Sequence, residues 1–474
     1  ERIPTERLLW PIREWPAATE KTRNNLKKRL LKPLLILREK KMSETIAAIS
    51  TAPGKGGISI IRISGDNAIL TADKVFCGKK RLADAKTHTI HYGKIVSGGK
   101  VIDECLCSVM RAPLSYTTED VVEINVHGGV YSAEMTLKAV LGAGARPAKP
   151  GEFTLRAFMN GRIDLSEAEA VGDIIDSKTA LAQSTAVNQL EGKLKEPVNN
   201  LRKRLVEILG YITVSSDFPD EDPDSLSGID IKKEIENIKK DTEIILNNAD
   251  RGIIIREGAL CAICGKPNVG KSSLLNALTG TDRAIVTEIE GTTRDVIEEY
   301  ININGVPVKL ADTAGIRENA DEVEKIGVKK AKEYIDKADL CIFVADNSRK
   351  FEKEDAEIFS LLKNKKVITV LNKSELENEC TLPPYILNPV KISVRTGEGI
   401  AEITDRIYDE LMGEEFSSDS VLITNGRHKE ALAFADSEIG KALTELESGA
   451  PVDLCSIYLE SAVSHLGEIT GMTV

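Results

Sequence analysis

The residues best suited to chemistry form the run Gly265-Lys266-Pro267-Asn268-Val269-Gly270-Lys271-Ser272. Its spacing is that of a phosphate-binding loop, in which glycines let backbone N–H groups surround phosphate oxygens. An apolar run of strand type, Ala259–Cys264, precedes the loop, and good helix formers, Ser273–Leu278, follow it. A strand before and a helix after are the context that the motif requires, and the helix N-terminus adds partial positive charge. We therefore expect Lys271 to reach the β- and γ-phosphates of a nucleotide and the Ser272 hydroxyl to ligate Mg²⁺.

Two further motifs follow in the order found in GTP hydrolases. Asp312-Thr313-Ala314-Gly315 comes after Val306–Ala311, an apolar-rich run that we expect to be an inner strand. An aspartate at a strand end can hold Mg²⁺ through water, and the Gly315 N–H can meet the γ-phosphate. Between the two motifs, Gly291-Thr292-Thr293-Arg294-Asp295 offers a threonine that completes the Mg²⁺ shell only when the γ-phosphate is present. That dependence predicts a switch loop.

The base is expected to be read by Asn372-Lys373-Ser374-Glu375, which follows the buried strand predicted at Val367–Leu371. Guanine-binding GTPases have N-K-x-D in this slot, and the carboxylate accepts from the N1–H and 2-amino groups of guanine. Glu375 is one methylene longer than that aspartate, and Ser393-Val394 stands where S-A is usual. Because adenine leaves the carboxylate unmatched, guanine is the predicted base despite both departures.

The composition indicates a soluble globular protein of about three domains, with 474 residues, 42% hydrophobic and 29% charged. No stretch approaches the ~20 apolar residues of a membrane span. Eight cysteines form no recognisable disulfide framework, which favours a cytoplasmic location. Cys261-x-x-Cys264 lies on the strand that feeds the phosphate loop, so core packing is favoured over zinc. The net charge of −11 argues against bulk nucleic-acid binding through the overall field.

Residues 1–41 differ from the rest in their content of Lys, Arg and Pro, and we interpret them as a non-native or upstream extension. Residues 42–160 are predicted to form an α+β domain. Its expected strands are Thr45–Ser50, Ile58–Gly65, His88–Val96, Val101–Arg111 and Val121–Val126, and its expected helices are Asn67–Phe76 and Tyr131–Leu141. Ala145–Glu152 is predicted to be a linker-like turn.

Two charged residues lie inside apolar strands of this domain, Arg62 and Glu123. A charge on a buried strand needs a partner or a ligand. Alternatively, both residues lie on the solvated face of an alternating strand. The pattern alone does not separate these two interpretations.

Helical patterns flank the nucleotide-binding part on both sides. Thr154–Leu209 is predicted to be mostly amphipathic helix, and further helices are expected at Ile231–Asn248, His428–Glu447 and Asp453–Ile469. The acidic run Asp217–Pro223 is predicted to be a solvated loop. The predicted fold is multidomain α/β: an α+β domain (42–160), a discontinuous helical domain (161–256 and 416–474), and an inserted Ras-like P-loop GTPase domain (257–415).

Several stretches together resemble one family closely, the tRNA modification GTPases called MnmE or TrmE. They are Ala52–Gly57, Ile61–Gly65, Val126–Gly129, Pro150–Thr154, Asp217–Pro219, Gly291–Asp295 and Asp312–Glu318, and the resemblance covers nearly everything from Met42 onward. It implies an N-terminal domain that forms a homodimer and binds 5-formyltetrahydrofolate or a related folate, with Arg62, Glu123 and Arg162 at the folate-contacting positions.

The resemblance also implies partners. Family members work with the flavoprotein MnmG (GidA), which supplies FAD and NADH. Together they add an aminomethyl or carboxymethylaminomethyl group at C5 of the wobble uridine of certain tRNAs. No membrane partner is expected.

The family's GTPase depends on K⁺, and two GTPase units face each other to order the switch loops. Carried onto this chain, the K⁺ ligands are Asn268, Thr287, Ile289 through its carbonyl, and Thr292. Glu324 matches the residue that orients the attacking water. Ile316 stands where Ras-type enzymes place a glutamine, which independently requires another residue to position the water.

The expected catalytic residues are Glu324, Lys271 and Gly315, and the expected Mg²⁺ ligands are Ser272 and Thr293. The residues expected to contact GTP are Asn268, Val269, Gly270, Lys271, Ser272, Ser273, Thr287, Glu288, Ile289, Glu290, Gly291, Thr292, Thr293, Asp312, Thr313, Ala314, Gly315, Asn372, Lys373, Glu375 and Ser393.

The family typically ends in a Cys-x-Gly-Lys tail, and this sequence stops at Val474 before it. If the tail is absent, GTP hydrolysis is expected to persist while tRNA modification fails. Two other functions stay open. A ribosome-assembly GTPase switch usually carries a basic RNA-binding module, which the acidic balance disfavours. A folate-dependent one-carbon transferase with a regulatory GTPase would turn over folate without the flavoprotein.

Overall fold

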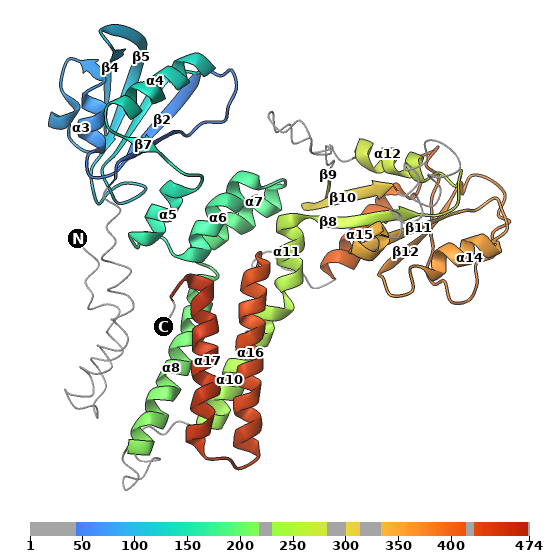
Figure 1. Cartoon of the computed structure of the whole chain (residues 1–474). Helices are drawn as coiled ribbons and strands as arrows, with labels where there is room; N and C mark the ends of the chain where they lie inside the picture. The colour runs from blue at the N-terminus through green and yellow to red at the C-terminus, as the bar shows by residue number, and fades with distance from the viewer. Residues whose placement is uncertain (1–43, 218–229, 282–299, 313–332, 414–420, 473–474) are drawn as a thin grey trace. The chain divides into compact units, whose positions relative to one another are not determined.

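The computed structural model describes residues 44–217, 230–281, 300–312, 333–413 and 421–472, without the side chains of 215–217, 281 and 312 (Figure 1). The chain divides into two compact units. We call residues up to Ala168 the N-terminal unit and Glu169 to Thr473 the C-terminal unit, and each is described by itself.

The N-terminal unit is built on a seven-stranded sheet in the order β3-β4-β5-β6-β2-β1-β7. Its strands are β1 (Ile46–Ile49), β2 (Ile58–Ser64), β3 (Phe76–Gly78), β4 (Thr89–Ser97), β5 (Lys100–Met110), β6 (Val121–His127) and β7 (Arg146–Pro147). Alternate residues of the strands point to opposite faces. One face is apolar and packs on α3 (Ala68–Asp73) and α4 (Val130–Gly142), which makes one core. The other face carries Arg62 and Glu123.

Two predictions for this unit are wrong in detail. The helix expected over Asn67–Phe76 ends at Asp73, because Phe76 begins β3 instead. Its ring lies against the next strand, where a Cβ at Gly93 would come within 2.4 Å of it. The expected turn after α4 contains β7, which pairs in parallel with β1. In both places tertiary packing overrides the local signal.

The segment Thr154–Leu209, which was predicted to be mostly helix, forms four helices. They are α5 (Glu152–Met159), α6 (Leu165–Asp176), α7 (Ala180–Leu190) and α8 (Lys195–Asp217). Two of the breaks contain a glycine with positive φ, Gly161 at 74° and Gly192 at 90°, a conformation that disfavours helix continuation. The acidic run predicted as a loop lies outside the described residues apart from Asp217.

The helices expected on both sides of the nucleotide-binding part are present and share one core. They are α8, α10 (Ile231–Asn247), α16 (Gly426–Glu447) and α17 (Val452–Thr470). Their contact explains how a chain interrupted by a second sheet still forms one bundle (Figure 1). A Cβ at Gly252 of α11 (Ala249–Glu257) would lie 2.2 Å from the carbonyl oxygen of Ile423. The chain entering the second sheet therefore touches the chain returning from it.

The second sheet has the order β13-β12-β11-β8-β10-β9. Its strands are β8 (Ala259–Cys264), β9 (Tyr300–Ile303), β10 (Val306–Asp312), β11 (Leu340–Asp346), β12 (Val367–Asn372) and β13 (Val390–Lys391). Neighbouring strands are parallel except for the β9–β10 hairpin. Apolar clusters cover both faces, and α12 (Lys271–Thr281), α14 (Lys353–Ser360) and α15 (Ile400–Met412) surround the sheet.

The predicted fold class is confirmed, and β8, β10 and β12 lie where strands were expected. Both cysteines of Cys261-x-x-Cys264 are buried in this sheet. None of the helices in the described ranges combines the length and apolarity needed to traverse a bilayer.

Candidate functional site

The predicted phosphate loop connects the end of β8 to the start of α12. It needs unusual backbone angles, with φ at 148° for Gly265, 64° for Asn268 and 100° for Gly270. The glycines also have no room for a side chain. A Cβ at Gly265 would lie 2.3 Å from the Val344 carbonyl oxygen, and one at Gly270 would lie 2.2 Å from Nδ2 of Asn372. Both glycines are therefore required by conformation and by space.

Lys271 begins α12 and is buried, and its ammonium folds back over the loop. Nζ donates to the carbonyl oxygens of Gly265 at 2.9 Å and of Lys266 at 2.7 Å. These bonds place a positive charge inside the curve of the loop, where phosphate oxygens are expected. Ser272 and Ser273 follow in the first helical turn, and both are exposed.

Asn372 joins the base-recognition segment to the phosphate loop. It is buried, and its Nδ2 donates to the Val269 carbonyl oxygen at 2.8 Å. Its Oδ1 accepts from the backbone N–H groups of Lys373 at 2.8 Å and Val394 at 3.3 Å. One amide side chain therefore holds three loops, which come from β8, β12 and β13, at fixed separations.

Lys373 makes a second connection between the same loops. Its Nζ forms an ion pair with Asp346 at 2.6 Å and donates to the Asn268 carbonyl oxygen at 3.2 Å. Asp346 ends β11 and is buried. The charge pair therefore ties the β11 end to the phosphate loop.

The acid of the base-recognition motif, Glu375, is exposed and lies beside Ser393, which is fully buried. A hydrogen bond from Ser393 lowers the pKa of Glu375 below its ordinary value. The carboxylate is therefore an anion at neutral pH and can accept hydrogen bonds from a ligand. The two departures from the usual motif leave this acceptor in place.

Part of the predicted GTP site lies outside the described residues. These residues are Thr287, Glu288, Ile289, Glu290, Gly291, Thr292, Thr293, Thr313, Ala314, Gly315 and Glu324, together with the side chain of Asp312. The backbone of Asp312 is paired with Ile263 at the end of β8, so β10 leads to the same edge of the sheet as the phosphate loop.

A second candidate site lies on the open face of the N-terminal sheet. Arg62 and Glu123 are direct neighbours across β2 and β6, and Nε donates to Oε1 at 2.8 Å. Their side chains are 27% and 23% exposed. Both interpretations from the sequence hold in part, because the pair lies on the open face and each residue is the other's partner.

Aromatic rings surround this pair. The guanidinium carbon of Arg62 lies 5.3 Å from the ring centroid of Tyr116 and 5.5 Å from that of Phe153. Arg162 approaches the same Tyr116 ring at 4.9 Å and donates from Nη1 to its carbonyl oxygen at 3.0 Å. The structure thus brings the three predicted folate positions together. Tyr116 and Phe153 were not predicted as site residues, because no spacing in the sequence relates them to Arg62.

Comparisons with known proteins identify the family that the chain is similar to. A family model described as the MnmE helical domain matches residues 165–474, and one described as the GTP-binding protein TrmE N-terminus matches residues 45–162. The tRNA modification GTPase MnmE of Acetivibrio thermocellus is 48% identical over 439 residues, 91% of this chain and 96% of that protein. The MnmE of Carboxydothermus hydrogenoformans is 48% identical over 441 residues, with the same shares.

Among solved structures, Aquifex aeolicus Era bound to GDP·AlF4⁻ is 30% identical. It covers 38% of this chain and 66% of its own, with a TM-score of 0.26, a value too low to carry an argument.

Proposed function

The chain belongs to the MnmE family of tRNA modification GTPases, and on that premise we propose that it hydrolyses GTP at residues 265–272 to support tRNA modification. The observation that carries the proposal is the position of Asn372. It holds the base-recognition segment against the phosphate loop, so a nucleotide on Lys271 has its base directed to Glu375. ADP and GDP binding to the purified chain test this step. Equal affinity for the two would refute guanine recognition.

We further propose that hydrolysis is stimulated by K⁺, with Asn268, Thr287, Ile289 and Thr292 as ligands. Asn268 is an exposed residue of the phosphate loop, and an amide oxygen is a suitable donor for an alkali cation. Bound there, K⁺ supplies positive charge where negative charge develops between the phosphates. Ser272 and Thr293 are the proposed Mg²⁺ ligands, and Glu324 is proposed to orient the water.

GTP turnover in KCl and NaCl tests this mechanism. Asn268→Ala and Glu324→Ala are each expected to lose about a hundredfold in rate, the usual cost of removing a transition-state interaction. Asn276→Ala is the control, because Asn276 is exposed on α12 away from the loop. A wild type that is indifferent to the cation would refute the K⁺ role and leave GTP hydrolysis standing.

We propose that the aromatic-lined pair in the N-terminal unit binds 5-formyltetrahydrofolate or a related folate. The residues fit such a ligand. The rings of Tyr116 and Phe153 offer flat apolar surface, Glu123 offers an acceptor for ring N–H groups, and Arg62 and Arg162 offer cations for carboxylates. A bound folate would supply a one-carbon unit. Loss of folate binding in Arg62→Ala is the expected result.

A homodimer through the N-terminal unit is also proposed. The face that carries Arg62 also exposes large apolar side chains on β2, β4 and β5, namely Ile58 at 62%, Ile90 at 66%, Tyr92 at 64% and Leu106 at 45%. Tyr92 is registered with Leu106 across neighbouring strands. Exposed apolar side chains gathered on neighbouring strands, as on β4 and β5, are typical of an interface. Tyr92→Lys is expected to shift the mass measured by light scattering toward the monomer.

The finer reaction rests on family membership. We propose that the chain acts in the cytoplasm with the flavoprotein MnmG, which supplies FAD and NADH, to modify C5 of the wobble uridine of certain tRNAs. The domain boundaries proposed are 42–160, 161–256 with 416–474, and 257–415. The shared core of α8, α10, α16 and α17 supports the discontinuous middle domain. Modified uridine measured by mass spectrometry after incubation with the flavoprotein tests the reaction. GTP hydrolysis without any modification would refute the proposed reaction for this chain and leave GTP hydrolysis standing.

A further inference from the structure

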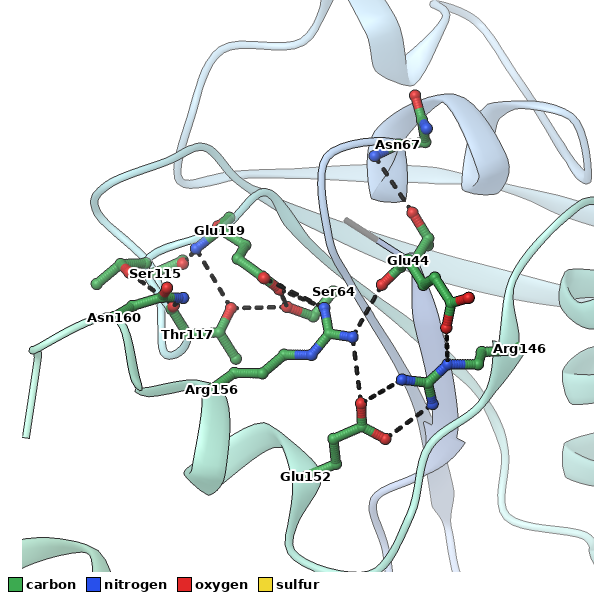
Figure 2. Close-up of polar contacts among 12 residues, drawn as sticks. Glu44, Ser64, Asn67, Ser115, Thr117, Glu119, Arg146, Glu152, Arg156 and Asn160 are labelled. Carbon is green, nitrogen blue, oxygen red and sulfur yellow. Dashed lines mark hydrogen bonds and ion pairs between the residues drawn. The ribbon is translucent and has the colours of Figure 1, made fainter. Parts of the chain in front are cut away.

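A buried arginine lies behind the aromatic-lined pair of the N-terminal unit. Arg156 of α5 is only 1% exposed. Its Nη1 donates to both carboxylate oxygens of Glu119, at 3.1 and 2.9 Å (Figure 2). Its Nη2 donates to the Glu44 carbonyl oxygen at 2.8 Å and to Oε1 of Glu152 at 3.2 Å. Because the N–H groups of a guanidinium point in fixed directions, the two carboxylates and the carbonyl can receive these bonds in only one arrangement.

Both carboxylates have further partners. Ser64 of β2 donates to Glu119 at 2.7 Å, so the glutamate is also anchored to the sheet. Glu152 accepts from Nη1 and Nη2 of Arg146, at 2.9 and 2.6 Å (Figure 2). Arg146 also pairs with the exposed carboxylate of Glu44, so two cations meet three anions in the network. The network is thus a directional cluster rather than an isolated buried charge.

The Arg156–Glu119 pair joins two segments of chain. Glu119 lies on the loop between β5 and β6, and that loop also carries Tyr116. Arg156 lies on α5, which also carries Phe153. These are the two rings around Arg62.

Weaker hydrogen bonds also join the β5–β6 loop to α5. The hydroxyl groups of Tyr116 and Thr154 lie 2.9 Å apart, and Asn160 donates to the Thr117 carbonyl oxygen at 2.7 Å. All of them join the β5–β6 loop to α5 or to the residue after it. In the ion pair Arg156 is 1% and Glu119 13% exposed, whereas Tyr116 and Thr154 are half-buried and Asn160 is exposed.

Net stability does not account for a buried ion pair, since apolar packing of similar volume is often as stabilising. Fixed geometry does account for it. We propose that Arg156 and Glu119 are positioning residues for the folate site, and that they set the distance between Tyr116 and Phe153, the two rings near Arg62. This inference rests on the proposed folate function. Neither residue is required to touch the ligand.

Glu152 provides a matched control, because it also meets Arg156 but lies on α5 itself. Glu119→Gln removes the negative charge and one acceptor oxygen from the connection between loop and helix, so Nη1 of Arg156 keeps at most one of its two bonds to this side chain. Glu152→Gln removes a carboxylate from the same guanidinium and leaves that connection in place. Arg156→Lys keeps the positive charge and removes the forked guanidinium, whose two Nη groups contact Glu119 of the loop and Glu152 of α5 separately.

The experiment measures 5-formyltetrahydrofolate affinity of the full chain by calorimetry, with thermal unfolding alongside. Glu119→Gln and Arg156→Lys are expected to weaken binding about ten- to a hundredfold, as loss of supporting contacts commonly does. Glu152→Gln is expected to lower the unfolding temperature at least as much and to keep affinity within about threefold. Equal loss of affinity in Glu119→Gln and Glu152→Gln would mean a merely structural role and overturn the proposal.

A ligand-free measurement separates this inference from the folate proposal. The chain has nine tyrosines, so 3-fluorotyrosine labelling gives a countable set of ¹⁹F signals, and Tyr116→Phe identifies one of them. That signal is expected to shift in Glu119→Gln and to stay in place in Glu152→Gln. A wild type that binds no folate refutes the folate function, whereas an unmoved Tyr116 signal in Glu119→Gln refutes positioning.

Discussion

Replacing Gly270 by alanine is expected to weaken GTP binding severely, through two effects at one position. The φ angle of Gly270 is 100°, which an L-residue adopts only with strain. The new Cβ would also lie 2.2 Å from Nδ2 of Asn372, the atom that donates to the Val269 carbonyl oxygen. Either the loop changes shape or Asn372 moves and breaks that bond.

The cost follows from the two effects. Left-handed strain costs about 1–2 kcal/mol for a residue with a Cβ. A buried hydrogen bond broken with its partner left in place costs about 1–3 kcal/mol. Because the loop must keep its shape to surround phosphates, the combined cost falls on nucleotide binding. About 2–5 kcal/mol corresponds to between about thirtyfold and a few thousandfold in the dissociation constant.

Gly280 supplies the matched control on α12, the helix that follows the loop. A Cβ at Gly280 would meet no atom of the described residues within 4 Å, so Gly280→Ala should bind GTP like the wild type. It should also gain up to about 1 kcal/mol of stability from helix propensity. Fluorescent-nucleotide titration and thermal unfolding of both variants are the assays. The reasoning is refuted if Gly270→Ala binds GTP normally, or if Gly280→Ala loses affinity equally.

Three further predictions use titratable groups. Hydrogen bonds from Arg146 lower the pKa of Glu152 from 4.5 to about 2. Above pH 4.5 the free energy of unfolding of the wild type should therefore exceed that of Glu152→Gln by about 3 kcal/mol. This difference should be lost as the pH falls toward 2. A constant difference in denaturant unfolding across that range would contradict this linkage. A hydrogen bond to Asp103 raises the pKa of His127. The stabilising effect of this pair is therefore complete below pH ~6.5 and is lost as the pH rises through the folded-state pKa of His127. NMR titration of Asp103→Asn should show the His127 pKa return to its ordinary value. Glu375→Gln should lower the selectivity for GDP over ADP about ten- to a hundredfold in competition binding, because a charged acceptor is lost. Ser393→Ala should raise the pKa of Glu375 and have a smaller effect on this selectivity.

The phosphate loop and the elements on either side of it could be predicted because they are local in sequence. Eight consecutive residues make the phosphate loop, and the strand and helix on either side follow directly from apolar runs. Asn372 was identified by its place after a buried strand. The sequence did not indicate that its amide donates to Val269, since that contact joins residues far apart in the chain.

The N-terminal site was less predictable for the same reason. Arg62 and Glu123 stood out as charges in apolar strands, and the resemblance added Arg162. Tyr116 and Phe153 both lie near Arg62, on the β5–β6 loop and on α5, and these two segments are joined by the Arg156–Glu119 ion pair and by weaker hydrogen bonds. A pairing of that kind has no local periodicity or composition.

The close approach of Gly252 to Ile423 has a consequence for the whole nucleotide-binding part. The chain between those two residues leaves the helical bundle and returns to it at a single contact, so its entry and exit lie side by side. The nucleotide-binding part is therefore hard to rotate about either connection, because the second connection opposes the rotation. It could equally be cut out and bridged by a short linker without straining the helices that remain.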